Sequence, residues 1–280
     1  MQPPSCVICP LCGGAFTLAE RAWRCVNGHA FDLAREGYVN LLPVQHKHSR
    51  EPGDRPDSIS ARRAFLDGGF YLPLRDTLVA MLGSRSRQSN LLDIGCGEGF
   101  YTSALTGLAS GVVGLDIAKP AVRMAARRYP GITWIVGSGA RLPLADGSID
   151  TVCSLFTPLH PDEIARVLQP QGELLIATPA DTHLQALRAA LFERVEPHEP
   201  EKFRRTFEPT LACVEAREVR YPLTLGALDL ARLLEMTPYA WKAHPERRAA
   251  LQAGGGLLTE AAFVLMRFRK SPAESSPHSS

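Results

Sequence analysis

Four residues near the start of the chain have the types and the spacing of a tetrahedral zinc site. They follow the order C-x2-C-x12-C-x3-H and are Cys9, Cys12, Cys25 and His29. The first pair can come from one tight turn, and the second pair closes the tetrahedron from a neighbouring loop. Metal binding would fold such a short segment, because the four ligands take the place of a large core. A disulfide or scattered free thiols are the alternative, but neither needs His29 at this offset.

Cys6 is a competing ligand, because it stands three residues before Cys9. We favour Cys9 and Cys12 as the first pair, since Gly13 and Gly14 follow them directly and give the backbone its turn. The cysteines outside the proposed site are irregularly spaced, which indicates a reducing compartment rather than a disulfide framework.

A second group of residues has the pattern of a nucleoside-binding loop. The segment LLDIGCGEG, over residues 91–99, places an expected strand directly before a glycine-rich turn. Gly95 permits a sharp turn, and Gly97 lets a ligand approach the backbone closely. Asp116 ends the next expected strand, where a carboxylate can accept hydrogen bonds from both hydroxyls of a ribose. The glycine spacing differs from the G-x-G-x-x-G of a dinucleotide site.

The loop and the acid together resemble those of class I methyltransferases, which use S-adenosylmethionine. In that fold the glycine loop holds the methionine part of the donor, and the acid at the end of the second strand holds its ribose. A nicotinamide or nucleotide-sugar enzyme is the alternative that these residues leave open.

The elements that must position these residues follow from hydrophobic patterning. After residue 88, short apolar runs alternate with helix-length segments, which is typical of a mostly parallel sheet with helices on both faces. The expected strands are 91–94, 112–115, 133–136, 151–155 and 174–178, with an antiparallel pair near 219–223 and 262–268. The expected helices are 60–69, capped by Ser60, and 72–82, 101–108, 121–128, 162–168 and 182–193.

The expected fold class is α/β, with a class I methyltransferase domain of the Rossmann-like type and a small N-terminal zinc-binding domain. We predict the metal module in residues 1–40, a linker with helices in 41–88 and the catalytic domain in 89–270. Residues 271–280 are rich in Ser and Pro and are predicted to form a disordered tail.

Composition argues against two classes of protein: nucleic-acid binders that rely on bulk positive charge, and membrane-spanning proteins. The net charge of the 280 residues is only +2, so any nucleic-acid surface must be a local patch. No uninterrupted apolar run approaches the length of a membrane span, so no membrane partner is expected. The N-terminus has neither the basic nor the apolar stretch of a secretory leader, and a cytoplasmic location is the expectation.

Longer segments carry a more specific resemblance. The metal-binding spacing runs into FDLAREGYVNLLP at 31–43 and is followed by ARRAFLD at 61–67. Further along come DIGCGEG at 93–99, ATP at 177–179 and MTPYAW at 236–241. In these segments the chain resembles the RlmA family of 23S rRNA guanine-N1 methyltransferases, over nearly its whole length except the tail.

The resemblance implies an enzyme that methylates N1 of one guanine in a hairpin loop of 23S rRNA, with S-adenosylmethionine as the donor. The zinc module, with the four Cys and His ligands named above, would help to recognise the RNA. The sequence leaves the oligomeric state open, and a homodimer is compatible with it. Family positions that contact the cofactor match Tyr71, Gly97, Glu98 and His183, with Gly95 in the same loop and Asp116 expected at the ribose.

The run LPVQHK at 42–47 and the MTPYAW segment are more similar to the family branch that acts at guanine 745, in hairpin 35, than to the branch that acts at guanine 748. The 748 branch is one alternative. A small-molecule methyltransferase of the quinone or sterol type is another, although it would have no reason to carry a zinc module. An RNA-binding zinc protein without catalysis would have no reason to keep the glycine loop and Asp116.

The chemistry at guanine N1 requires more than a methyl donor. N1 carries a proton that must leave during or before transfer, so the site needs a base or donors that stabilise charge on O6. The sequence does not assign this catalytic group. Candidates near strand ends are Glu98, His160 and His183.

RNA contacts are expected from two further sets of residues. Phe156, Tyr239 and Trp241 are candidates for stacking on the extruded base, with a role in the core as the alternative. A basic run between the two domains is the candidate for phosphate contacts, although such runs are often solvated connectors. Its members are His46, Lys47, His48, Arg50, Arg55, Arg62 and Arg63.

Overall fold

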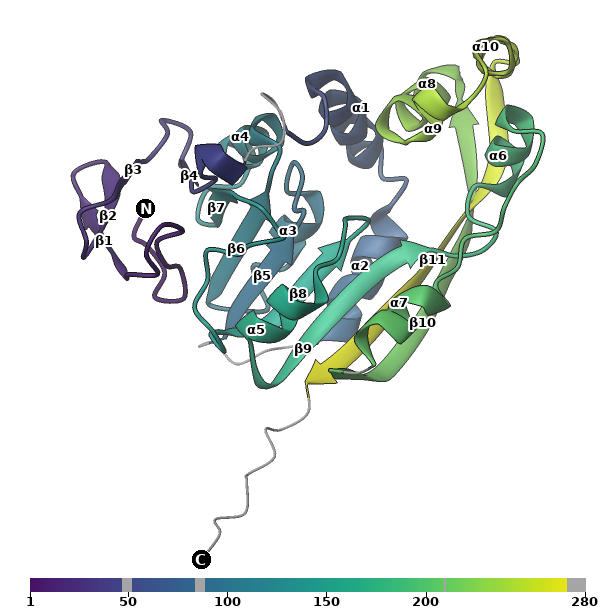
Figure 1. The fold of residues 1–280 in the computed structure, drawn as a ribbon. Coiled ribbons are helices and arrows are strands. Elements are labelled where there is room, and N and C mark those ends of the chain that lie inside the picture. Colours follow the sequence, from purple (N-terminus) through teal and green to yellow (C-terminus); the bar gives the residue numbers. More distant parts are fainter. Residues whose placement is uncertain (47–51, 84–88, 209, 271–280) are drawn as a thin grey trace, which may run out of the picture.

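An eight-stranded sheet forms the centre of the molecule (Figure 1). The computed structural model describes residues 1–46, 52–83, 89–208 and 210–270. The strand order is β10-β11-β9-β8-β5-β6-β7-β4. In chain order these strands are β4 (Tyr38–Asn40), β5 (Asn90–Ile94), β6 (Gly111–Asp116), β7 (Thr133–Val136), β8 (Ile149–Leu155), β9 (Leu168–Pro179), β10 (Leu211–Gly226) and β11 (Gly256–Lys270).

Six neighbouring strands, from β9 to β4, run parallel, and β11 lies antiparallel between β9 and β10. From the central strand β5 the chain proceeds on one side through β6 and β7, and on the other side through β8 and β9. Ligands of open α/β sheets bind at the carboxyl edge where the strand order reverses, which here lies between β5 and β8. The predicted α/β fold is confirmed, including the late antiparallel pair.

Helices flank the sheet and place apolar side chains on both of its faces (Figure 1). Leu91 and Leu92 of β5 belong to different buried clusters, because successive strand side chains point to opposite faces. None of the helices in the described ranges has the length and apolarity to cross a lipid bilayer. The helices are α1 (Pro56–Asp67), α2 (Leu72–Leu82), α3 (Phe100–Ala104), α4 (Lys119–Arg128), α5 (Pro161–Val167), α6 (Gln185–Leu191), α7 (Glu201–Phe207), α8 (Ala227–Met236), α9 (Tyr239–Lys242) and α10 (Pro245–Ala253), with the short 3₁₀ helix η1 (Val44–His46) before them.

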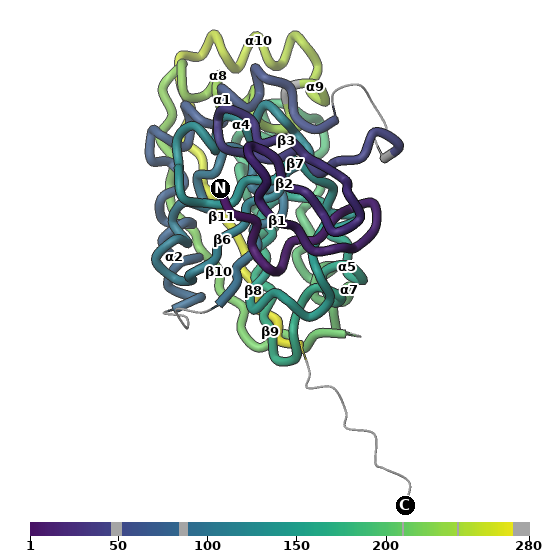
Figure 2. The backbone as a smooth tube through the Cα atoms, turned by 90° about the vertical axis from the view of Figure 1, so that its left-hand side faces the viewer, coloured from purple at the N-terminus to yellow at the C-terminus, as the bar shows by residue number. Residues whose placement is uncertain are grey.

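The N-terminal segment forms a separate three-stranded antiparallel ribbon. Its strands are β1 (Phe16–Ala19), β2 (Ala22–Cys25) and β3 (Ala30–Asp32). Trp23 is fully buried in it, 5.7 Å from the ring of Phe16. Figure 2 shows this ribbon in front of the main sheet, on the side of β7.

Backbone hydrogen bonds attach the ribbon to the segment that follows β7. The amide of Ile8 donates to the carbonyl of Pro143 at 3.0 Å, and the amide of Ala145 donates to the carbonyl of Cys6 at 2.9 Å. Arg166 on α5 holds the same segment, since its guanidinium donates to the carbonyls of Leu142 and Leu144. The N-terminal segment is therefore fixed to the main domain by main-chain hydrogen bonds.

The chain joins the main sheet at its edge directly after the ribbon. β4 lies parallel to β7, with Tyr38 opposite Trp134, and the amide of Leu41 donates to the carbonyl of Val136 at 2.9 Å. The predicted domain boundary at residue 40 stays a prediction, as do the others. The tail over 271–280 lies outside the described residues.

Several features differ from the sequence expectation, among them β4 and α7, which were not predicted. α1 begins at Pro56 rather than after Ser60, because proline is well suited to the first helical turn, and the Ser60 hydroxyl donates back to the carbonyl of Pro56 at 2.9 Å. The three helices α8 to α10 between β10 and β11 were not predicted. Of these, α8 packs against α1, which places both above the carboxyl edge of the sheet (Figure 1).

Gly114 of β6 provides a test of the packing beneath the glycine loop, because a Cβ there would overlap the buried ring of Trp134. We expect Gly114→Ala to lower the free energy of unfolding by about 1–3 kcal/mol through overpacking. Urea denaturation followed by tryptophan fluorescence measures this change. Gly107→Ala is the matched control, since no atom lies within 4 Å of its added methyl group, and equal effects of the two substitutions would contradict the packing argument.

Candidate functional site

The structure brings the four predicted metal ligands together in the ribbon, with all their ligand atoms within 4.8 Å of one another. The Sγ atoms of Cys12 and Cys25 are 3.7 Å apart. His29 Nδ1 lies 3.6 Å from the Sγ of Cys9 and 3.4 Å from that of Cys25. Tetrahedral bonds of about 2.3 Å to sulfur and 2.0 Å to nitrogen require separations of roughly 3.5–3.8 Å. The donor set therefore fits zinc, and the sulfur atoms are too far apart for a disulfide.

A tight turn presents the first pair of thiols. The amide of Gly13 donates to the carbonyl of Cys9 at 2.8 Å. The side chain of Asn27, hydrogen-bonded to Cys12, lowers the pKa of that thiol to about 6 and so favours the thiolate that a metal requires. Cys6 is buried outside the group of four, where burial raises the pKa of its thiol to about 11.

The carboxylate of Asp116 ties the glycine loop to the end of β6. Its Oδ2 accepts a hydrogen bond from the amide of Gly97 at 2.9 Å, and its Oδ1 accepts one from the amide of Ala118 at 2.7 Å. Each oxygen keeps a second lone pair, so two ribose hydroxyls could still be bound. Burial raises the pKa of Asp116.

Gly97 presents its backbone where a ligand is expected. It has a φ of +55°, and a Cβ at this position would meet only the guanidinium of Arg62, at 4.0 Å. A side chain would be strained in this conformation and would project into the open space in front of the loop. The loop is therefore shaped for close approach of a ligand to the main chain.

Two other carboxyl groups are buried beside the loop. Asp93 accepts a hydrogen bond from the hydroxyl of Thr102 at 2.6 Å, and burial raises the pKa of Asp93 to about 7. Burial also raises the pKa of Glu98, against the opposing effect of Arg63 and Arg128. Glu98 thus lies near the positive charges of α1 and α4 rather than in solvent.

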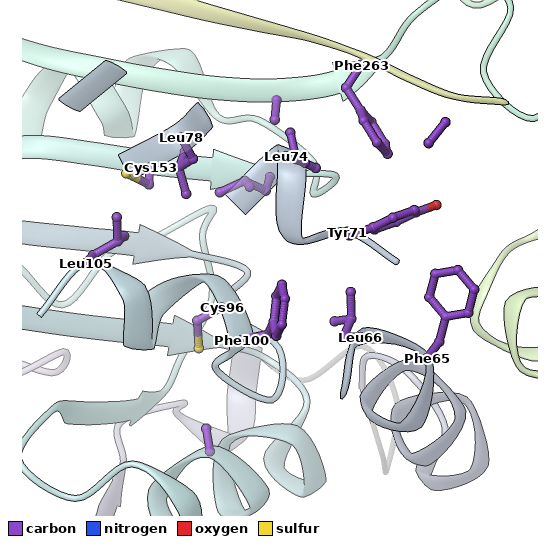
Figure 3. Close-up of a cluster of buried hydrophobic side chains, with 14 of the residues drawn as sticks. Phe65, Leu66, Tyr71, Leu74, Leu78, Cys96, Phe100, Leu105, Cys153 and Phe263 are labelled. Carbon is purple, nitrogen blue, oxygen red and sulfur yellow. The ribbon is translucent and has the colours of Figure 1, made fainter. Parts of the chain in front are cut away.

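An aromatic cluster joins Tyr71 and His183, two of the predicted cofactor contacts. The ring of Phe263 lies 5.0 Å from that of Tyr71 and 4.5 Å from that of His183. Figure 3 shows Tyr71 between Phe263 and Phe65, with Phe100 of α3 close by. The cluster therefore connects the start of α2 with β11 and with the segment after β9.

His183 is held as a neutral imidazole. Its Nδ1 is 3.2 Å from the amide nitrogen of Ala262, which donates to it, and burial together with His198 lowers the pKa of His183 to about 3. The hydrogen bond assigns the remaining ring proton to Nε2. His183 can therefore donate a hydrogen bond through Nε2–H, but it has no free ring nitrogen that could accept a proton.

Phe156 stands in a strained conformation at the carboxyl end of β8. Its φ is +56°, its side chain is 45% exposed, and its ring lies 5.5 Å from Phe263 and 6.5 Å from Tyr101. Non-glycine residues in the left-handed region carry roughly 1–3 kcal/mol of strain and cluster at functional sites. An exposed ring beside the point where the strand order reverses is well placed to stack on a flat ligand.

The other predicted aromatic and base candidates lie elsewhere. Tyr239 packs on Phe192 with ring centroids 5.9 Å apart, and Trp241 is 67% exposed on α9. His160 precedes α5, with its ring beside Gly139. The structure thus brings Phe156, and neither of the other two aromatics, into ring contact with the Phe263 cluster.

The predicted basic run divides into different environments. Lys47, His48 and Arg50 lie outside the described residues, and His46 ends η1. Arg62 pairs with Asp54 and donates to the carbonyl of Met236 at 3.4 Å. Arg55 and Arg63 line a cavity beside α4.

Sequence reasoning missed Tyr101 and Phe263. Tyr101 follows the glycine loop by two residues, so its position relative to that motif could have indicated it. Phe263 belongs to a strand without a motif, and only the insertion of β11 beside β9 brings it to Tyr71 and Phe156. The signal for this residue is in the topology and not in the local sequence.

Two family descriptions match separate parts of the chain. The N-terminal zinc ribbon of RlmA matches residues 7–50, and a methyltransferase domain matches residues 92–176. The first match covers all four clustered ligands, and the second covers the glycine loop and Asp116. The predicted cofactors, zinc and S-adenosylmethionine, are confirmed at the level of these families.

Three relatives are similar to the chain over most of its length. A 23S rRNA (guanine(748)-N(1))-methyltransferase of Streptomyces fradiae is 36% identical over 251 residues, which are 86% of this chain and 88% of the relative. Two others are provisionally named 23S rRNA guanine-N1-methyltransferases. That of Micromonospora griseorubida is 34% identical, with 93% and 96% covered, and that of Bacillus subtilis is 32% identical, with 87% and 90% covered.

Removal of one ligand tests the metal centre. We expect the purified protein to hold about one zinc ion per chain and Cys25→Ser to lose most of it, because three ligands bind the ion far more weakly. Elemental analysis by mass spectrometry measures the metal content. Cys6→Ser should keep its zinc; metal retained in Cys25→Ser but lost in Cys6→Ser would show that the ligand set is wrong.

The buried Asp93 predicts a pH dependence of stability. Its folded pKa is raised above the unfolded value, so its stabilising contribution is present at low pH and is lost as the pH rises through about 7. Between pH 6 and pH 8 the wild type should lose about 1.4 kcal/mol of unfolding free energy relative to Asp93→Asn. Parallel denaturation curves at the two pH values provide the comparison, and a constant difference would contradict the raised pKa.

Proposed function

Because the chain belongs to the family of 23S rRNA guanine-N1-methyltransferases, we propose that it transfers the methyl group of S-adenosylmethionine to N1 of a guanine in 23S rRNA. The observation that carries the proposal is the occurrence of both modules in one chain that spans 88% of a relative named for this reaction. A quinone or sterol methyltransferase would not explain the matched zinc ribbon. Such a reaction on rRNA implies a cytoplasmic enzyme.

We propose Cys9, Cys12, Cys25 and His29 as the zinc ligands. Their separations support this role, and the ion would fix the two turns of the ribbon. Main-chain hydrogen bonds, one donated by Ile8 to Pro143 and one accepted by Cys6 from Ala145, then hold the ribbon beside the main sheet. We propose that the ribbon presents RNA to the carboxyl edge.

We assign the donor to the space in front of the glycine loop. Gly95 and Gly97 would admit the methionine part, and Asp116 would bind the ribose hydroxyls through its remaining lone pairs. We propose Tyr71, Glu98 and His183 as the remaining contacts of the donor. Of these, Tyr71 and His183 share the Phe263 cluster.

S-adenosylmethionine supplies a methyl group that is already electrophilic, so the protein mainly has to position the acceptor nitrogen and exclude water. The neutral His183, with its proton on Nε2, suits a hydrogen-bond donor and does not suit the acceptor of the N1 proton. The acceptor of the N1 proton is therefore another group at the carboxyl edge. We propose Phe156 as the surface on which the extruded guanine stacks, because it is exposed and strained at the end of β8.

We propose guanine 745 in the loop of hairpin 35 as the target, because residues 42–47 and 236–241 resemble the family branch that acts at this position. Guanine 748 is the second candidate, because the relative at 36% identity is named for that position. The same assay separates the two.

Methylation of a hairpin 35 transcript tests the function and the position together. The purified protein with S-adenosylmethionine should produce a reverse-transcription stop at guanine 745, because an N1-methyl group blocks base pairing. Asp116→Ala should reduce the yield at least about tenfold through loss of two ribose hydrogen bonds. A stop at guanine 748 instead would select the second candidate, and RNA of unchanged mass under saturating donor would overturn the function.

A further inference from the structure

A large cavity lies between the N-terminal segment, the start of α1 and α4. Its volume is about 1160 Å³. Six of its seventeen lining residues are Arg or Lys and two are Asp, whereas the whole chain has a net charge of only +2. The basic members are Arg55, Arg63, Lys119, Arg123, Arg127 and Arg128.

One wall of the cavity is a row of cations on α4. Lys119, Arg123 and Arg127 are spaced by four residues, so they lie on the same helix face about 6 Å apart along the axis. The side chains of Arg123 and Arg127 are 52% and 56% exposed. Both guanidiniums contact one carboxylate oxygen of Glu36, at 2.7 and 2.9 Å. The pair is therefore already arranged around an anionic oxygen.

Residues of α1, the end of α4 and two apolar side chains complete the lining of this groove. Arg63 comes from α1, and Arg128 is held towards it by Asp67, which pairs with Arg128 at 2.7 Å and with Arg63 at 3.8 Å. The apolar lining includes Ile117 and Met124. Ile117 directly follows Asp116, so the groove reaches the place proposed for the donor ribose.

We propose that this basic groove binds the sugar-phosphate backbone of the RNA strand that leads into the methylation site. The inference rests on the proposed function and adds residues that the basic run in the sequence did not include. Charge complementarity selects the occupant, because the six cations that α1, α4 and the segment before α1 contribute match a polyanionic strand, and a small acidic ligand would contact only some of them. Arg62 does not line the cavity and instead contacts Asp54 and the carbonyl of Met236.

Binding of a fluorescent hairpin 35 transcript at several salt concentrations tests the groove. Arg123→Gln/Arg127→Gln should weaken binding at least about tenfold near physiological salt. The slope of log affinity against log salt should become shallower by about 1.4–1.8, the value for two lost phosphate contacts. Affinity for S-adenosylmethionine, measured by calorimetry, should stay unchanged.

Arg194→Gln/Arg217→Gln is the matched control, because it removes the same charge from exposed residues that do not line the cavity. It should leave the salt slope within about 0.3 of the wild type. An unchanged slope in the α4 variant, or an equal loss in the control, would overturn the groove. Weaker donor binding in the α4 variant would assign the cavity to the cofactor instead.

The wild type in the same assay separates this inference from the proposed function. If the wild type methylates the hairpin and the α4 variant binds RNA equally well, only the groove is wrong. If the wild type neither binds nor methylates any 23S rRNA hairpin, the proposed function fails first.

Discussion

The two hydrogen bonds accepted by Asp116 are the constraint on which the rest of the site depends. They hold the amides of Gly97 and Ala118, so the turns after β5 and β6 keep a fixed relation at the carboxyl edge. The carboxylate is partly desolvated, and these amides replace water that it has lost. Because the same oxygens retain lone pairs, one side chain both fixes the loop and, in the proposed site, would bind the donor ribose. Tyr71, His183 and Phe156 are then arranged around the other end of that site by Phe263 of β11.

The metal ribbon is connected to this site through the main chain. Ile8 and Cys6 pair with the segment after β7, and Arg166 fastens that segment to α5. A small ribbon has little core of its own beyond Trp23 and its neighbours, so the ligands and these contacts must define its position. The ribbon is consequently attached to the main domain by hydrogen bonds of its own backbone rather than loosely tethered.

Local spacing was enough to predict that the four Cys and His residues converge, that a glycine loop follows β5, that Asp116 ends β6, and where most of the strands lie, because each depends on residues that are close in sequence. The helices α7 to α10 were missed. The MTPYAW segment at 236–241 spans the end of α8 and the start of α9, but its family resemblance carries no information on secondary structure. Ser60 was misplaced as a cap because Pro56 had already started the helix. Phe263 and the row of cations on α4 had no readable signal. A helix face bearing Lys119, Arg123 and Arg127 resembles an ordinary solvated surface until the fold brings Arg63 of α1 to the same cavity.

Glu36 has a further effect on how the groove can bind. Its Oε1 accepts one hydrogen bond from each of Arg123 and Arg127, so it holds the two side chains in place before any RNA arrives. Each guanidinium has five N–H donors, and most of them stay available to a phosphate. The entropy cost of ordering two flexible arginine side chains is then met during folding, which leaves more of the interaction energy for the RNA.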